Sequence, residues 1–262
     1  MEMFLELNII VQVVIATAFT WGVTALGASM VFLFKSLNAK VLDLLLGFAA
    51  GVMLAASFWS LLNPAVELSE ELGKLSWFAP CLGFFAGGIF VMIADLILEK
   101  ITSSKPVYKD KKRSLLLVGA ITLHNIPEGL AVGVAFASAS LGIEGATTLS
   151  ACLLALGIGL QNFPEGAGVS LPLRRDGYSK SKSFFYGQAS GIVEPFAGLI
   201  GVLLASFIRS ILPFLLSFAA GCMVLVVTRE LVPEASKDNK NHSSIGFIFG
   251  FIIMMLLDVS LG

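Results

Sequence analysis

Long runs of apolar residues, separated by short polar stretches, dominate the chain. Eight of them reach the roughly 20 residues that a helix needs to cross the hydrocarbon core of a bilayer. Their approximate limits are 7–34, 41–63, 76–98, 114–139, 147–171, 183–208, 211–233 and 243–261. The pattern predicts an all-α integral membrane protein, with residues 1–262 forming a single transmembrane domain of eight transmembrane helices.

The composition agrees with this prediction. Of the 262 residues, 56% are hydrophobic and only 13% are charged, and the mean hydropathy is +0.90. Soluble domains contain about 25% charged residues. We therefore expect the lipid bilayer to be the main environment of the chain, with no nucleic-acid partner.

The positive charges are distributed unevenly between the two sides of the predicted helices. Fourteen of the 17 Lys and Arg residues follow odd-numbered helices, six of them in or beside the predicted loop 99–113, whereas only Lys74 and Arg209 lie in the other connections. The positive-inside rule places loop 99–113 in the cytoplasm and both termini outside it. A short multi-pass chain of this kind fits a prokaryotic plasma (inner) membrane.

Two sequence echoes indicate internal repeats. "LLVGAITLHNIPEG" (116–129) aligns without a gap to "LLALGIGLQNFPEG" (153–166), and "GFAAGVML" (47–54) resembles "SFAAGCMV" (217–224). Each echo joins helices that should run in opposite directions. This predicts a 3+2+3 inverted-repeat arrangement, with helices 1–3 near 7–98, a central pair near 114–171 and helices 6–8 near 183–261, an arrangement typical of transporters.

The first echo carries a polar cassette deep in two apolar helices. His124 and Glu128 lie four residues apart and so share a helix face. Pro127 and Pro164 cannot donate to the carbonyls four residues earlier, so each helix should kink or loosen beside the polar side chains. The cassettes contribute His124, Asn125 and Glu128 from helix 4 and Gln161, Asn162 and Glu165 from helix 5.

Buried carboxylates require a partner. Glu128, Glu165 and Glu194 all fall in mid-helix, where an ionised side chain costs several kcal/mol unless it is paired or metal-bound. A divalent cation is the natural countercharge. An imidazole with carboxylate and amide oxygens suits Zn²⁺, and Fe²⁺ or Mn²⁺ nearly as well.

The order of motifs "HNIPEG", "QNFPEG", "GQASGIVEP" and "ELVPEA" closely resembles the ZIP family of divalent-metal transporters, in particular its GufA-like branch. The resemblance implies zinc as the transported substrate, with Cd²⁺, Fe²⁺ and Mn²⁺ as further candidates, carried toward the cytoplasm by an elevator-like shift of a transport domain. It also implies a binuclear metal site bridged by Glu128 and Glu165. Its first position comprises His124, Glu128, Gln161 and Glu165, and its second comprises Asn125, Asn162 and Glu194.

Several positions depart from the family pattern. Gln161 stands where many members have His, and Asn162 stands where some carry an acidic ligand. In helix 7, Arg229 stands beside Glu230 where some relatives have His. Either a structural Arg–Glu pair or the lining of a metal exit would account for Arg229 and Glu230.

Three functional classes compete for this pattern. A metal transporter is favoured, and we expect no enzymatic activity. An intramembrane metalloenzyme could use a bound metal to activate water, but the chain lacks an HExxH motif. A metal-gated channel without alternating access is the other alternative, and a homodimer is the expected oligomer.

Overall fold

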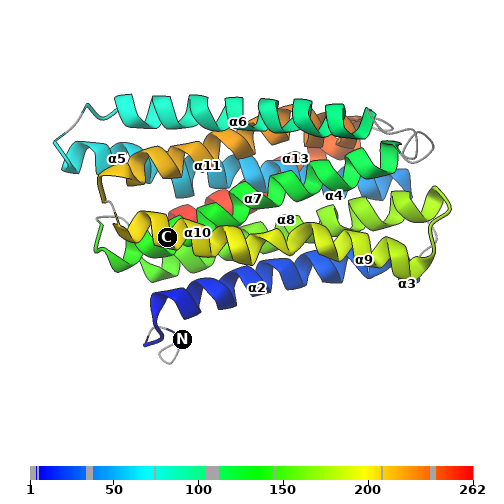
Figure 1. Ribbon diagram of the computed structural model, residues 1–262, viewed down its shortest axis with the longest axis horizontal. Helices are drawn as coiled ribbons and strands as arrows, with labels where there is room; N and C mark the ends of the chain where they lie inside the picture. The colour runs from blue at the N-terminus through cyan, green and yellow to red at the C-terminus, as the bar shows by residue number, and fades with distance from the viewer. Residues whose placement is uncertain are drawn as a thin grey trace.

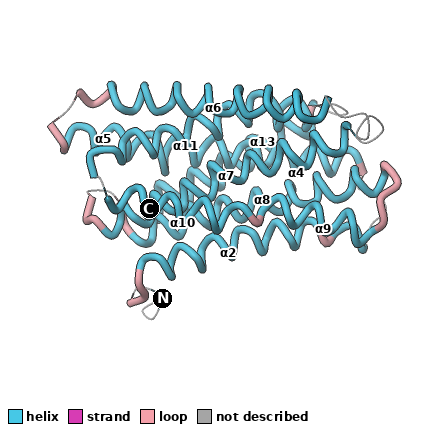
Figure 2. Tube along the Cα trace, viewed as in Figure 1, coloured by secondary structure: helices cyan, strands magenta, loops and turns pink. Residues whose placement is uncertain are grey.

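The computed structural model describes residues 4, 6–33, 38–73, 75–103, 112–143, 146–207, 209–236 and 240–261. Its regular structure is helical throughout these ranges, and the helices run along one common direction with the turns at the two ends of the bundle (Figures 1 and 2). In chain order the elements are α2 (Ile9–Ala28), α3 (Met30–Leu33), α4 (Ala39–Ala56), the π-helix η1 (Ser57–Leu62), α5 (Asn63–Glu71), α6 (Phe78–Ser103), α7 (Lys112–Ser140), α8 (Thr148–Arg175), α9 (Lys180–Gly191), α10 (Val193–Phe207), the 3-10 helix η3 (Arg209–Ile211), α11 (Leu212–Val226), the π-helix η4 (Val227–Leu231), α12 (Val232–Ala235) and α13 (Lys240–Leu261).

Six helical segments of the described chain are long and apolar enough to cross a membrane. They are Ile9–Leu33, Ala39–Glu71, Phe78–Ile97, Lys180–Ala205, Leu212–Ala235 and Lys240–Ser260. The all-helical membrane fold is thereby supported. The count of eight crossings also requires α7 and α8, the helices that carry the polar cassettes, and it stays a prediction.

Two helices continue past prolines at which the hydropathy windows end. The second predicted helix ends at 63, but the chain remains helical through Pro64 to Glu71, and the seventh passes Pro233 to Ala235. In each case a π-helical turn precedes the proline, which then lies in the first turn of the next α-helix. Proline is tolerated there because no helical partner is needed for its missing N–H.

Two further boundaries differ from the prediction. The predicted loop 99–113 is shorter, because α6 extends to Ser103 and α7 begins at Lys112; residues 104–111 lie outside the described residues. The predicted sixth helix is divided, since α9 ends at Gly191 and α10 begins at Val193. Pro195 has no N–H to donate to Gly191, four residues earlier, which explains a weak point in the helix here.

Close backbone contacts organise the helices into two groups. The most extensive helix pairs are α2 with α8, α7 with α10, α4 with α13 and α6 with α11. In each pair a glycine of one helix lies against the backbone of the other, as Gly27 does against Phe163 and Gly51 against Phe247. We call α2, α7, α8, α9 and α10 the first helix group, and α4, α6, α11 and α13 the second; Figure 1 shows the second group above most of the first.

The two groups meet through side chains. Gly157 of α8 faces the Sδ atom of Met254, and Gly168 of α8 faces a methyl group of Leu46. No described glycine lies directly against a backbone atom of the opposite group. At these glycines, contact within a group is backbone to backbone, whereas contact between the groups is made to side chains.

Candidate metal site

The two polar cassettes lie side by side on α7 and α8, which contact each other. Both helices continue through their internal prolines, Pro127 and Pro164. Gln161 Nε2 donates a hydrogen bond to Glu128 Oε1, so the cassettes meet directly through their side chains. His124 belongs to α7, one turn before Glu128, but its side chain lies outside the described residues.

Glu194 joins the cassettes from α10. It occupies the first turn of that helix, directly after the break at Ile192, and is fully buried. Asn162 Nδ2 donates to Glu194 Oε1 at 2.9 Å. From α7, Asn125 Nδ2 donates to the carbonyl of Ser190 at 2.8 Å, just before the same break.

The acidic and amide side chains of this cluster are withdrawn from solvent. Glu165 is 2% exposed, and the others are 0% exposed. Glu165 interacts electrostatically with both Glu128 and Glu194. The structure thus brings together the predicted residues Asn125, Glu128, Gln161, Asn162, Glu165 and Glu194.

Four buried oxygen atoms of the cluster have no hydrogen-bond partner among the described residues. They are Asn125 Oδ1, Glu128 Oε2, Gln161 Oε1 and Asn162 Oδ1. Leaving a buried polar atom unsatisfied typically costs about 1–3 kcal/mol, and more when it is charged. A cation bound among these oxygens would remove that cost.

The donor set is mixed. Within the described part of the chain, no three His, Cys, Asp or Glu side chains lie close enough together to hold one ion. Among the described residues, amide oxygens stand beside the carboxylates and could complete the coordination of a cation. Such oxygen-rich surroundings accept several divalent metals.

Sequence reasoning missed the contribution of α2. Thr20 Oγ1 donates to Glu194 Oε2, and Thr24 Oγ1 lies 3.5 Å from Glu194 Oε1. The one sequence signal was the spacing of Thr17, Thr20 and Thr24, which places three hydroxyls on one helix face. Threonine is common in membrane helices as a partner of its own backbone, so the spacing alone does not identify a site.

Arg229 has an acidic partner on another helix. Asp95 lies two residues before the end of the apolar span Phe78–Ile97 of α6. The Arg229 Nη1 atom lies 3.3 Å from Asp95 Oδ2. Arg229 therefore forms an ion pair between α6 and η4, and its role is at least partly structural.

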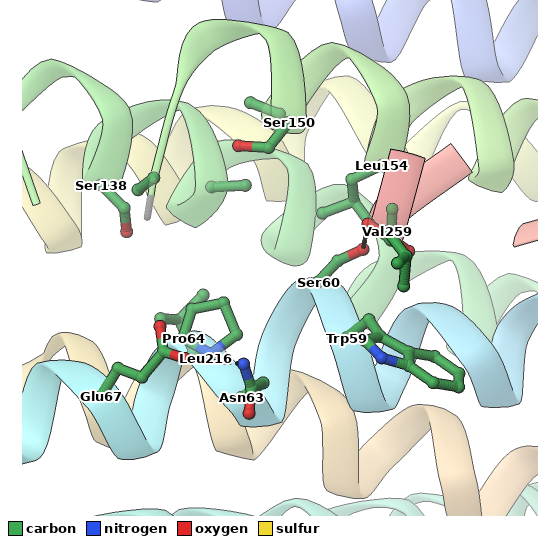
Figure 3. Close-up of a pocket in the computed structure, with 14 residues that line it drawn as sticks. Trp59, Ser60, Asn63, Pro64, Glu67, Ser138, Ser150, Leu154, Leu216 and Val259 are labelled. Atoms are coloured by element: carbon green, nitrogen blue, oxygen red, sulfur yellow. Dashed lines mark hydrogen bonds between the residues drawn. The ribbon is translucent and has the colours of Figure 1, made fainter. Parts of the chain in front are cut away.

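A polar cavity of about 170 Å³ lies farther along the bundle (Figure 3). Ala135 of α7 and Leu154 of α8 contribute to its lining. Each is seven residues from its cassette, at Glu128 and Gln161 respectively, or about 10 Å of helix. Further lining comes from η1, α5, α11 and α13, so the cavity lies between the two helix groups.

Two side-chain pairs give this cavity its polarity. Ser60 Oγ donates to Asp258 Oδ1 at 2.7 Å, and Asn63 Nδ2 donates to Glu67 Oε1 at 2.8 Å. Both acceptors are carboxyl groups. The cavity can therefore attract cations at the end of the bundle where α7 ends and α8 begins.

Comparison with known proteins points to one family. The family model described as "ZIP Zinc transporter" matches residues 103–258. The chain is 40% identical to zinc transporter ZIP11 of Xenopus tropicalis, over 97% of this chain and 98% of that protein. It is 35% identical to zinc transporter GufA of Myxococcus xanthus, over 95% and 98% of the two chains. With zinc transporter ZupT of Clostridium perfringens it shares 32% identity over 95% of each.

Proposed function

Because the chain belongs to the ZIP zinc transporter family, we propose that it carries zinc across a membrane through the buried cluster of α7, α8 and α10. The relatives named above are zinc transporters. The observation that carries the proposal is a cluster with three buried carboxyl groups, in which one carboxylate oxygen and three amide oxygens have no hydrogen-bond partner among the described residues. In the low-dielectric interior of a membrane protein, a divalent cation satisfies both features together.

The proposed ligand set has two positions. The first takes His124, Glu128, Gln161 and Glu165, and the second takes Asn125, Asn162 and Glu194, with Glu128 and Glu165 between them. The contact of Gln161 with Glu128 and that of Asn162 with Glu194 support this division, because each joins members of one position. Cd²⁺, Fe²⁺ and Mn²⁺ are compatible with the same donors and should be compared with Zn²⁺ in one preparation.

The proposed fold has eight crossings in a 3+2+3 inverted arrangement. Such symmetry exchanges the first helix with the sixth, the second with the seventh, the third with the eighth and the fourth with the fifth. The pair α2–α8 should then correspond to α10–α7, and α4–α13 to α11–α6; these are the four most extensive pairs. The π-helical turns η1 and η4 also fall in the second and seventh helices, as this symmetry requires.

An elevator-like movement fits the two helix groups. Every described residue of the proposed ligand set lies in the first group, in which close backbone contacts join α2 to α8 and α7 to α10. At Gly157 and Gly168 the groups meet through side chains, which could exchange neighbours as one group moves. The first group would move as a rigid body along the second, with the polar cavity between them as the access route on the outer side.

The proposed direction of transport is toward the cytoplasm, as the resemblance to the ZIP family implies. With both termini outside the cytoplasm, the cavity beside Asp258 would face outward, on the side from which zinc enters. The plasma membrane is the proposed location.

The decisive experiment is zinc uptake into proteoliposomes that contain the purified protein. Glu128→Ala should reduce uptake to the level of empty vesicles, whereas Glu70→Ala, at an exposed position on α5, should retain it. Normal uptake by the Glu128 variant would refute the assignment. Saturable, slow flux fits a carrier, whereas a conductance of channel magnitude would favour a metal-gated channel.

A further inference from the structure

Three threonines form a buried hydroxyl face on α2. Thr17, Thr20 and Thr24 are each 0% exposed and lie at positions i, i+3 and i+7 of the helix. This face packs against α8 and α10, where Gly166 and Gly198 allow close approach. The three hydroxyls nevertheless have different surroundings.

Two of them reach Glu194 of the proposed ligand set, and the shorter contact is that of Thr20. Thr20 Oγ1 donates to Glu194 Oε2, whereas the Thr24 hydroxyl is 3.5 Å from the other carboxylate oxygen. Thr17 Oγ1 bonds its own helix, to the carbonyl of Val13 at 2.7 Å. Thr20 therefore differs from its two neighbours on the same face.

Thr20 also contacts a second member of the set. Its backbone carbonyl lies 3.3 Å from Asn162 Nδ2, the same amide group that donates to Glu194 Oε1 at 2.9 Å. The hydroxyl of Thr20 thus contacts Glu194, and its carbonyl contacts Asn162, which are two of the three residues assigned to the second metal position. The carboxylate of Glu194 is fixed at one oxygen by Thr20 and at the other by Asn162.

Resting on the function proposed above, we propose that Thr20 is a positioning residue of the second metal position. A carboxylate that ligates a metal is commonly oriented by a hydrogen bond to its other oxygen. Thr20 performs this task for Glu194. It holds Oε2 toward α2, so that Oε1, which also accepts a hydrogen bond from Asn162, is the oxygen that meets the divalent cation.

A purely structural role makes a different prediction. Thr20 Oγ1 also lies 3.0 Å from the carbonyl of Thr17, so its hydroxyl could serve the helix as that of Thr17 does. A hydroxyl has one proton and donates it to one acceptor at a time. A positioning role requires Thr20 to act through Glu194, and a helix-packing role does not.

These roles are separated by measuring zinc binding to the purified protein, with the whole chain present, by isothermal titration calorimetry. Thr20→Val keeps the shape of the side chain and removes the hydroxyl. It should weaken the binding event that depends on Glu194 by about 10- to 100-fold, the usual effect of losing an outer-shell partner. Thr20→Ser should restore most of the affinity, and the matched control Thr17→Val should leave it unchanged.

A double-mutant cycle with Glu194→Ala completes the test. Thr20→Val should have no further effect on zinc binding in the Glu194→Ala background, because its target is already absent. An equal loss in both backgrounds, or an equal loss in Thr17→Val, would overturn the positioning role.

The same titrations distinguish this inference from the function on which it rests. Zinc binding that survives Glu194→Ala unchanged would refute the ligand set itself. Binding that is weakened by Glu194→Ala and unaffected by Thr20→Val would refute only the role of Thr20.

Discussion

Replacing Gly129 with alanine tests whether the close packing of α7 on α10 sets the ligand geometry. A Cβ atom at Gly129 would lie 2.7 Å from the Cα atom of Glu194, 0.7 Å inside the 3.4 Å at which ordinary contact begins. The atoms on both sides of this contact belong to helix backbones. Neither can rotate away, so the helices themselves must separate.

The expected effect follows from that distance. Metal–ligand distances are held within about 0.2 Å, and a separation of 0.7 Å at Glu194 moves it away from Asn125 and Glu128 by more than this tolerance. Overpacking of this kind also costs about 1–3 kcal/mol of stability. Gly129→Ala should therefore lower the midpoint of thermal unfolding and weaken zinc binding by at least about tenfold, or roughly 1.4 kcal/mol.

Two control variants separate the site from general destabilisation. Gly51→Ala places a Cβ 2.7 Å from the backbone nitrogen of Phe251, in the second helix group and away from the proposed ligands. It should lower the unfolding midpoint similarly but leave zinc binding intact. Gly22→Ala meets nothing within 4 Å and should change neither quantity. Equal zinc affinity in the Gly129 and Gly51 variants would refute the reasoning.

Three further predictions concern other parts of the bundle. Arg229→Met should lower the free energy of unfolding by about 1 kcal/mol. Because this variant has already lost the ion pair, adding Asp95→Asn to it should cost less stability than Asp95→Asn costs in the unmodified protein. Additive shifts in the unfolding midpoint would contradict this. The predicted orientation can be tested by cysteine labelling on intact cells, in a variant without its native cysteines. Glu70→Cys, predicted to lie outside, should react with a membrane-impermeant maleimide, and Ser181→Cys, predicted to lie in the cytoplasm, should not. The opposite pattern would show that the orientation is reversed. Asp258→Asn should raise the KM for zinc uptake several-fold at unchanged maximal rate, because cavity acids concentrate cations; initial rates with an unchanged KM would exclude that role.

The elements of the fold could largely be predicted from hydropathy, but the helix ends could not. The windows 114–139 and 147–171 fall close to α7 and α8 because apolar runs coincide with helices there. Pro64 ends a hydropathy window without ending the helix, since the preceding π-helical turn places it where it is tolerated. A π-helical turn has no simple sequence pattern, so this continuation could not be predicted.

The candidate site was predictable where its residues share a motif. Asn125 and Glu128 repeat as Asn162 and Glu165, and two such cassettes on one pair of helices indicate one common site. Thr20 was not predictable, because its contact with Glu194 spans 174 residues of the chain. Only tertiary packing brings α2 to the site. A threonine in a helix ordinarily bonds a carbonyl of its own helix, so the local sequence does not indicate a contact with Glu194.

A carrier that releases its ion must also return without it, and the hydrogen bonds of the site bear on that step. Without an ion, three carboxyl groups remain buried close to one another. Gln161 donates to Glu128, while Thr20 and Asn162 donate to Glu194. Hydrogen bonds to a charged group are worth about 1.5–3 kcal/mol each, so these donors offset part of the cost of the empty site. On the proposed mechanism, these neutral donors allow the first helix group to return without an ion. A lysine or arginine in their place would instead compete with zinc for the carboxylates.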